Sequence, residues 1–202
     1  MKLYPTLNST IEAAKKLDIP EERQKVLQEL IKFIQNKKDN GQPVLLNFIC
    51  THNSRRSQFS QIWAQTIAAI QGLNISSFSG GVEVTAFNLR AIAAIEKAGF
   101  KVHQEGDANP RVEVKYSEDA APIVAFSKKF DDPVNPAEGF AAIMTCSHAD
   151  ETCPFIAGAE ARIPVRYDDP KEFDGTAQEA GKYDERSLQI ASEMMYVFSN
   201  IK

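Results

Sequence analysis

The stretch FICTHNSRRSQFSQIWA, residues 48–64, joins an apolar run to the start of a helical pattern. Six mostly apolar residues at 44–49, VLLNFI, have the pattern of a strand buried on both faces. After Ser57 the apolar residues recur at helical spacing until Gly72. Cys50 therefore stands where a buried strand ends and a tight loop leads into a helix.

The same alternation of strands and helices continues toward the C-terminus. Strand patterns lie at 75–81, 112–117, 122–127, 140–145 and 162–167, and helical patterns at 85–100 and 183–201. Strands separated by helices pair in parallel. We therefore expect an α/β protein, a three-layer sandwich with a mainly parallel central sheet of about four strands.

Two segments fall outside this alternation. Residues 1–40 predict a helical N-terminal extension, in which Pro20 opens the second of two helices. Residues 115–140 form an insertion before the third main strand. Its part KKFDDPVNPAEG, residues 128–139, has two prolines and suggests a hairpin or an excursion from the sheet. Either segment could cover a site, form a dimer contact or add stability.

Composition limits the functions this chain can have. Its 202 residues, 43% of them apolar, suffice for a single domain over 1–202. The net charge of −4, with dispersed Lys and Arg, gives no basic surface for nucleic acid. No apolar run approaches the roughly 18 residues that span a bilayer, and the start lacks a signal-peptide core. We expect a cytoplasmic protein without a membrane partner, whose three cysteines are reactive or buried thiols.

The loop after Cys50 has the residues of an oxyanion site. In an open parallel sheet, ligands bind beyond the carboxyl ends of the strands. The backbone N–H groups of residues 51–56 can converge at the positive end of the next helix, where Arg56 adds a planar pair of donors. A thiol in such a positive field ionises readily, so Cys50 is expected to be a nucleophile. The predicted oxyanion-binding residues are Thr51, His52, Asn53, Ser54, Arg55, Arg56 and Ser57.

Two residues of the loop have expected supporting roles. Ser57 can donate a hydrogen bond to the thiolate, and Asn53 can brace the loop in a left-handed backbone conformation. The alternative interpretation is structural: Cys50 is a small core residue at the end of a strand and Arg56 is a surface charge.

The sequence CTHNSRRS, residues 50–57, resembles the phosphate-binding loop of the low-molecular-weight protein tyrosine phosphatase superfamily. That resemblance implies the superfamily's α/β fold and one of two chemistries. Its hydrolases cleave phosphotyrosine through a phosphocysteine. Its thioredoxin-coupled arsenate reductases use the same loop with two further cysteines.

The stretch MTCSHADETCPF, residues 144–155, is similar to the redox segment of those reductases. The resemblance implies that Cys146 and Cys153 form the redox pair and that Asp169, in the Asp-Asp-Pro at 168–170, is the general acid. It also implies arsenate or a phosphate ester as substrate, thioredoxin as the source of electrons, and no tightly bound cofactor or metal. Lys171 and Glu172 follow this motif where the hydrolases commonly have aromatic residues, with Phe173 only third.

Reduction of As(V) to As(III) takes two electrons. One thiol can supply them only if a second thiol completes a disulfide, so the chemistry also requires more than one cysteine. Cys146 could attack a Cys50–arsenic adduct, and Cys153 could then move the disulfide to Cys146–Cys153. Two helical turns rise about 10.5 Å over seven residues, whereas the Cα atoms of a disulfide are usually about 5.5–6 Å apart. The segment between the two cysteines is therefore expected to loop or refold.

Three residues depart from the pattern of the reductases. His52 stands where glycine is usual, and either faces solvent or adds a titratable group near the anion. Arg55 stands where a cysteine is common, and is expected to face water rather than to widen the positive funnel. Gln61 replaces an acidic residue that helps some reductases to hold potassium, so no ion is expected.

Other functions remain open from the residues alone. Cys146, His148 and Cys153, with Asp150 as a fourth ligand, permit a zinc site, although structural zinc sites favour shorter spacings. The two cysteines could also be buried structural thiols. A phosphatase needs only Cys50, Arg56 and Asp169, and a non-catalytic oxyanion sensor would bind without turnover.

Overall fold

The computed structural model describes residues 2–106, 108–152 and 155–202. Its central sheet has four strands, β1 (Val44–Cys50), β2 (Ile75–Gly81), β6 (Phe140–Met144) and β7 (Ala159–Pro164). They are ordered β2-β1-β6-β7, and every neighbouring pair is parallel. The predicted parallel α/β sheet of about four strands is confirmed.

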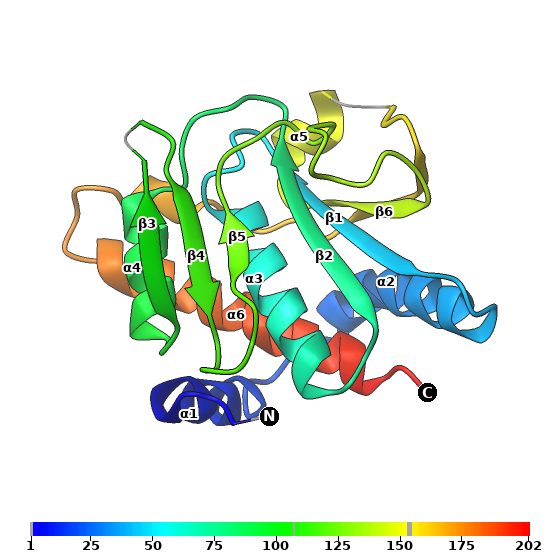
Figure 1. The fold of residues 1–202 in the computed structure, drawn as a ribbon, viewed down its shortest axis with the longest axis horizontal. Helices are drawn as coiled ribbons and strands as arrows, with labels where there is room; N and C mark the ends of the chain where they lie inside the picture. The colour runs from blue at the N-terminus through cyan, green and yellow to red at the C-terminus, as the bar shows by residue number, and fades with distance from the viewer. Residues whose placement is uncertain (1, 107, 153–154) are drawn as a thin grey trace.

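The long helices cover one face of this sheet. They are α2 (Glu21–Asp39), α3 (Arg56–Ile70) and α6 (Glu179–Ser199), and α6 packs against both of the others (Figure 1). Shorter elements are α1 (Pro5–Ala14), α4 (Leu89–Lys97), α5 (Ser147–Thr152) and a 3₁₀ turn, η1 (Pro170–Phe173). None of the helices in the described part of the chain is both long and apolar enough to cross a membrane.

The strand residues divide the core between the two faces of the sheet. Successive side chains of a strand point to opposite faces. Leu46 and Phe48 of β1 belong to the large core cluster, which includes residues of α2, α3 and α6. Ile49 belongs to a smaller cluster with Met144 and Ala149, on the face that α5 covers. The carboxyl ends of β1 and β6, next to α5, form the edge at which the candidate site lies (Figure 1).

Three strands between α4 and β6 form a second sheet, which corrects the expectation of parallel pairing. β3 (Lys101–Glu105), β4 (Arg111–Lys115) and β5 (Ile123–Ala125) are antiparallel in the order β3-β4-β5. β3 was not expected, because its sequence KVHQE is mostly polar and mostly exposed. This sheet lies beside the central one, and α3 contacts both β2 and β5 (Figure 1).

After β5 the chain returns to the edge of β2 instead of forming a hairpin. The N–H of Gly81 donates to the carbonyl of Lys128 at 2.8 Å, and the N–H of Phe130 donates to the carbonyl of Gly81 at 3.0 Å. A Cβ atom on Gly80 would lie 2.2 Å from Cα of Phe130, so only glycine permits this approach. The predicted excursion is therefore a segment whose backbone pairs with the end of β2, next to the loop after Cys50.

The boundaries of several elements differ from the sequence expectation. α4 begins after Asn88 because the side chain of Asn88 accepts hydrogen bonds from the N–H groups of Arg90 and Ala91. The pattern at 162–167 predicted a strand that the structure places at Ala159–Pro164. The last helix begins at Glu179, four residues before the predicted start.

The N-terminal extension packs on the domain through α2. Its buried residues include Leu27, Leu30 and Ile34, which join the large core cluster. Arg23 of α2 forms two hydrogen bonds with the carboxylate of Glu193, at 2.8 and 2.7 Å, and donates to the carbonyl of Arg166 at 3.0 Å. The extension thus contacts the segment that leads to Asp169.

Candidate active site

The loop from Thr51 to Arg55 turns the chain from β1 into α3 around the sulfur of Cys50. The N–H of Asn53 lies 3.2 Å from the Cys50 sulfur, and Oγ of Ser57 lies 3.1 Å from it. Because Ser57 Oγ accepts a hydrogen bond from the Asn53 amide at 2.8 Å, its own hydrogen is free to point at the sulfur. Cys50 is buried, and its sulfur is held by two groups that can donate to it.

Asn53 braces the loop, as the sequence predicted. Its φ of +46° is the only positive value among the non-glycine residues that the structure describes. Its side-chain oxygen accepts from the N–H of Lys128 at 3.0 Å, and its carbonyl accepts from the Gln58 amide at 2.9 Å. A Cβ atom on Gly81 would lie 2.7 Å from the N atom of Asn53. The glycine at the end of β2 therefore makes room for this backbone conformation.

Asp169 is held by both arginines of the loop. Arg56 donates from Nη2 to one carboxylate oxygen at 2.7 Å, and Arg55 donates from Nε to the other at 2.9 Å. Burial alone raises the pKa of Asp169, but the charges of Arg56 and Arg55 outweigh it and lower this pKa below its ordinary value. Arg56 also donates to the carbonyl of Tyr167 at 3.0 Å. The predicted nucleophile loop and general acid therefore meet in one site.

The expectation that Arg55 faces water is wrong. Its side chain is buried and turns toward Asp169, because the carboxylate offers a partner that fits its guanidinium. His52 also has a charged neighbour: its Nε2 lies 3.3 Å from Glu83, and its side chain is 38% exposed. The carbonyl of His52 accepts a hydrogen bond from Ser127 of the insertion at 2.8 Å and one from Thr85, in the segment after β2, at 3.2 Å.

Cys146 lies beside the loop, at the end of the strand next to β1. Its buried sulfur lies 3.4 Å from Oγ1 of Thr51, the residue that follows Cys50. The same hydroxyl lies 3.3 Å from Nδ1 of His148 in α5. The structure thus brings the first two predicted thiols to one edge of the sheet. Cys153 lies outside the described residues.

The residues proposed for a zinc site have other partners. The carboxylate of Asp150 forms ion pairs with Arg162, at 2.5 Å, and with Arg166. Within the described ranges, no group of three or more His, Cys, Asp and Glu residues is arranged to hold a metal. Gln61 accepts a hydrogen bond from Ser79 at 2.5 Å.

Sequence reasoning missed the residues that support the loop from a distance. The Gln58 side-chain amide donates hydrogen bonds to the carbonyls of Asn53 and Phe126, at 2.9 Å each. The backbone N–H of Lys128 donates to the side-chain oxygen of Asn53. Tyr167 donates to Glu193 at 2.8 Å, and Arg23 stacks over its ring. These contacts join segments far apart in the chain, so no local pattern in the sequence reveals them.

Comparisons with known proteins find arsenate reductases among the relatives of this chain. No protein-family model matches the chain. It is 23% identical over 135 residues to an arsenate reductase of Halalkalibacterium halodurans, which covers 67% of this chain and 80% of that enzyme. It is 27% identical over 152 residues to an arsenate reductase of Bacillus licheniformis, and that alignment covers 75% of this chain and 92% of that enzyme.

Solved structures share the fold. A low-molecular-weight phosphotyrosine phosphatase from Vibrio cholerae O395 superposes with a TM-score of 0.51 at 16% identity, covering 77% of this chain and 94% of that one. A mutant of YwlE from Bacillus subtilis superposes with a TM-score of 0.50 at 13% identity, covering 79% of this chain and 99% of that one. The chain therefore has the α/β fold of the low-molecular-weight protein tyrosine phosphatases. Its resemblance to that superfamily, and within it to the arsenate reductases, is confirmed.

Proposed function

We propose that this protein is an arsenate reductase that uses Cys50, Cys146 and Cys153 in sequence, with thioredoxin as electron donor. The observation that carries the proposal is the position of Cys146, whose buried sulfur lies 3.4 Å from the hydroxyl of Thr51, next to Cys50. A second thiol at this place fits a reaction in which the nucleophile must be released as a disulfide. The similarity to arsenate reductases also supports the proposal.

The first step forms a bond between Cys50 and arsenic. The Cys50 thiolate attacks arsenate, and one arsenate oxygen leaves as water after it accepts a proton from Asp169. The loop N–H groups and Arg56 hold the remaining oxygens, which requires Arg56 to exchange Asp169 for the anion. The product is a Cys50–As(V) adduct.

The next two steps carry out the reduction. The Cys146 thiolate attacks the Cys50 sulfur, the sulfur–arsenic bond breaks, and arsenic leaves with the electron pair as arsenite. The Cys153 thiolate then attacks Cys146, which releases Cys50 as a thiolate and leaves a Cys146–Cys153 disulfide for thioredoxin to reduce with two electrons. The helix α5, Ser147–Thr152, holds the two ends of this segment too far apart for a disulfide. We therefore expect α5 to unwind at this step.

The test is arsenate-dependent oxidation of NADPH in the presence of thioredoxin and thioredoxin reductase. We expect repeated turnover by the native protein, none by Cys50→Ser or Cys146→Ser, and no repeated turnover by Cys153→Ser. Loss of Cys153 alone is expected to allow a single turnover, with one arsenite per protein and a trapped Cys50–Cys146 disulfide that mass spectrometry detects. Turnover that survives Cys146→Ser would contradict the relay.

A phosphatase is the second candidate, and the contact of Asp169 with Arg56 favours it. Hydrolysis through a phosphocysteine at Cys50 needs only Arg56 to hold the phosphate and Asp169 to protonate the leaving oxygen. Release of phosphate from O-phospho-L-tyrosine distinguishes the two. Hydrolysis that survives loss of Cys146, without any arsenate turnover, identifies a phosphatase.

A further inference from the structure

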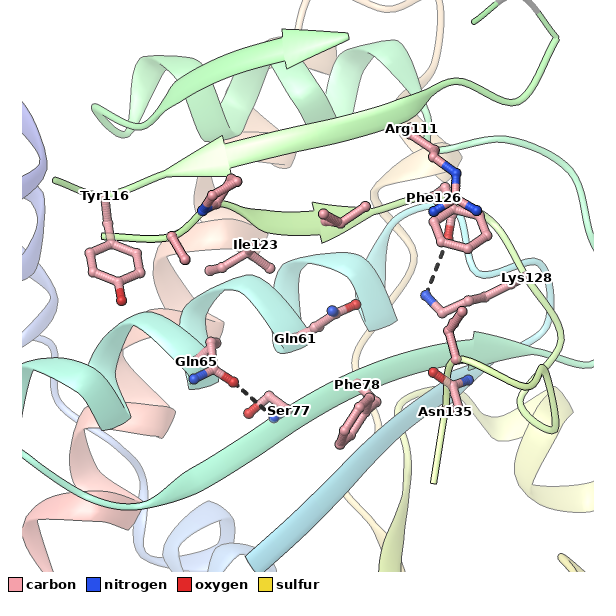
Figure 2. Close-up of a pocket in the computed structure, with 14 residues that line it drawn as sticks. Gln61, Gln65, Ser77, Phe78, Arg111, Tyr116, Ile123, Phe126, Lys128 and Asn135 are labelled. Carbon is pink, nitrogen blue, oxygen red and sulfur yellow. Dashed lines mark hydrogen bonds between the residues drawn. The ribbon is translucent and has the colours of Figure 1, made fainter. Parts of the chain in front are cut away.

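A cavity of about 450 Å³ lies between the antiparallel sheet, β3-β4-β5, and the central sheet (Figure 2). Gln61 and Gln65 of α3 and Ser77 and Phe78 of β2 form one side of it. β5 and the segment that follows it form the other side. The cavity is lined by none of the residues of the Cys50 loop, so it is separate from the site described above.

A buried lysine, Lys128, faces this cavity. Lys128 is only 4% exposed, and it forms no salt bridge with an acidic residue of the described ranges. Its ammonium has long contacts, 3.5 Å to Oγ of Ser79 and 3.4 Å to the carbonyl of Phe126. A buried charge normally requires a paired charge or short hydrogen bonds. A negatively charged ligand in the cavity would supply the close partner that Lys128 lacks among the described residues.

A second cation lies at the same end of the cavity. The ammonium of Lys128 and the guanidinium of Arg111 lie 4.6 and 4.7 Å from the centre of the Phe126 ring (Figure 2). Burial, the largest cause, and the charge of Arg111 lower the pKa of Lys128 to about 8, against the opposing effect of Asp132. The two positive charges repel each other, and an anion near both of them would relieve this repulsion.

The rest of the cavity is partly apolar and has unused hydrogen-bonding groups. Phe78, Ile123 and Val134 provide the apolar lining. Oγ of Ser77 and Oδ1 of Asn135 are buried without a hydrogen-bond partner in the described part of the chain. An amide oxygen can only accept, so a ligand group that reaches Oδ1 of Asn135 has to donate a hydrogen bond to it.

We propose that this cavity binds a small aromatic carboxylate that carries a hydroxyl or amino group. The carboxylate pairs with Lys128 and Arg111, the ring packs on Phe78 and Ile123, and the donor group reaches Asn135 or Ser77. A carboxylate fits better than a phosphate, because the cavity offers two cations but no helix N-terminus or row of backbone N–H groups. The inference is independent of the proposed reductase activity.

The test is isothermal titration calorimetry with 4-hydroxyphenylacetate, in buffer with saturating inorganic phosphate to block the Cys50 loop. We expect a Kd of about 1 mM or lower for the native protein, which corresponds to about −4 kcal/mol. The uncharged analogue tyrosol, with an alcohol in place of the carboxylate, is expected not to bind. Binding of tyrosol with equal affinity, or no binding of the carboxylate up to about ten times that Kd, would overturn the proposal.

Variants test the site independently of the probe. Lys128→Met is expected to weaken binding at least tenfold, whereas Lys129→Met, an exposed lysine next to it, is expected to leave the affinity unchanged. Arg111→Gln is a second variant whose exposed position protects the fold, and it is expected to weaken binding severalfold. Native affinity in both Lys128→Met and Arg111→Gln would place the ligand elsewhere and refute the assignment.

Discussion

Arg55 donates a hydrogen bond from Nε to Oδ1 of Asp169 at 2.9 Å, across 114 positions of the sequence. The neighbouring Arg56 holds the other oxygen of the same carboxylate. In the proposed reaction an oxyanion that enters the loop competes with Asp169 for Arg56, and the side chain of Arg55 can keep its contact with the carboxylate. We therefore expect Arg55 to keep Asp169 at the mouth of the site while Arg56 turns to the anion.

Loss of Arg55 should shift the pH dependence of activity. Two arginines hold the pKa of Asp169 below its ordinary value, so Arg55→Ala is expected to raise this pKa. A general acid acts only while protonated, and the alkaline limb of kcat/KM for O-phospho-L-tyrosine hydrolysis should therefore move to higher pH. Asp169→Asn, which cannot titrate, is the control and should lose that limb. An unchanged limb in Arg55→Ala would show that Arg55 does not act on the acid.

Asn53 should contribute to stability in two separable ways. Asn53→Ala loses the buried amide contacts with Ser57 and Lys128 and places alanine at a φ of +46°. Asn53→Gly loses the same contacts without the backbone strain. We expect urea unfolding to show glycine less destabilising than alanine by about 1–2 kcal/mol. Equal destabilisation would mean that the positive φ is relieved in the variants.

Arg23 should stabilise the fold from the N-terminal extension. Glu193 is 2% exposed, so Arg23→Ala leaves a buried carboxylate without its cation. The expected loss in free energy of unfolding is about 3–5 kcal/mol. Lys25→Ala on the same helix removes only exposed ion pairs, and is expected to cost about 0–1 kcal/mol. A similar small loss for both variants would argue against a structural role for the extension.

Gly81 should be essential for the shape of the loop. A Cβ atom there would lie 2.6 Å from the carbonyl oxygen of Glu83 and 2.7 Å from the N atom of Asn53, both backbone atoms. Because a displacement of about 1 Å in a catalytic loop can cost roughly 100-fold in rate, Gly81→Ala is expected to reduce kcat by about that factor. Gly181→Ala, in α6 with no neighbour within 4 Å, is the matched control and should retain activity. Full activity of Gly81→Ala would mean that the loop tolerates the shift.

Lys128 should make stability rise with pH in the alkaline range. Its pKa is about 8 in the folded protein and near 10.5 in the unfolded chain. Between these values the unfolded state binds more protons, so the free energy of unfolding increases as pH rises from 8 toward 10.5. The contribution is at most about 3 kcal/mol, at 1.36 kcal/mol per pH unit. Urea unfolding of Lys128→Met should lack this rise relative to the native protein, and equal slopes would contradict the burial of the charge.

The sequence was enough to predict the strand, loop and helix that carry Cys50. The strand, loop and helix around Cys50 are contiguous, so apolar spacing and the residues of the loop were enough to predict the central sheet, the nucleophile loop and the brace at Asn53. The positions of Cys146 and Asp169 followed from a resemblance, and the structure brings both to the loop through Thr51 and Arg56.

Only the tertiary structure decided the contacts between distant segments. Arg55 turns away from water because Asp169, in the segment that follows β7, accepts its hydrogen bond, and Lys128 supports Asn53 because the insertion returns to the edge of β2. The antiparallel sheet of β3, β4 and β5 likewise depends on pairing between strands rather than on the pattern of any one strand. Spacing along the chain records which face of an element is buried, but not which distant side chain will meet it there.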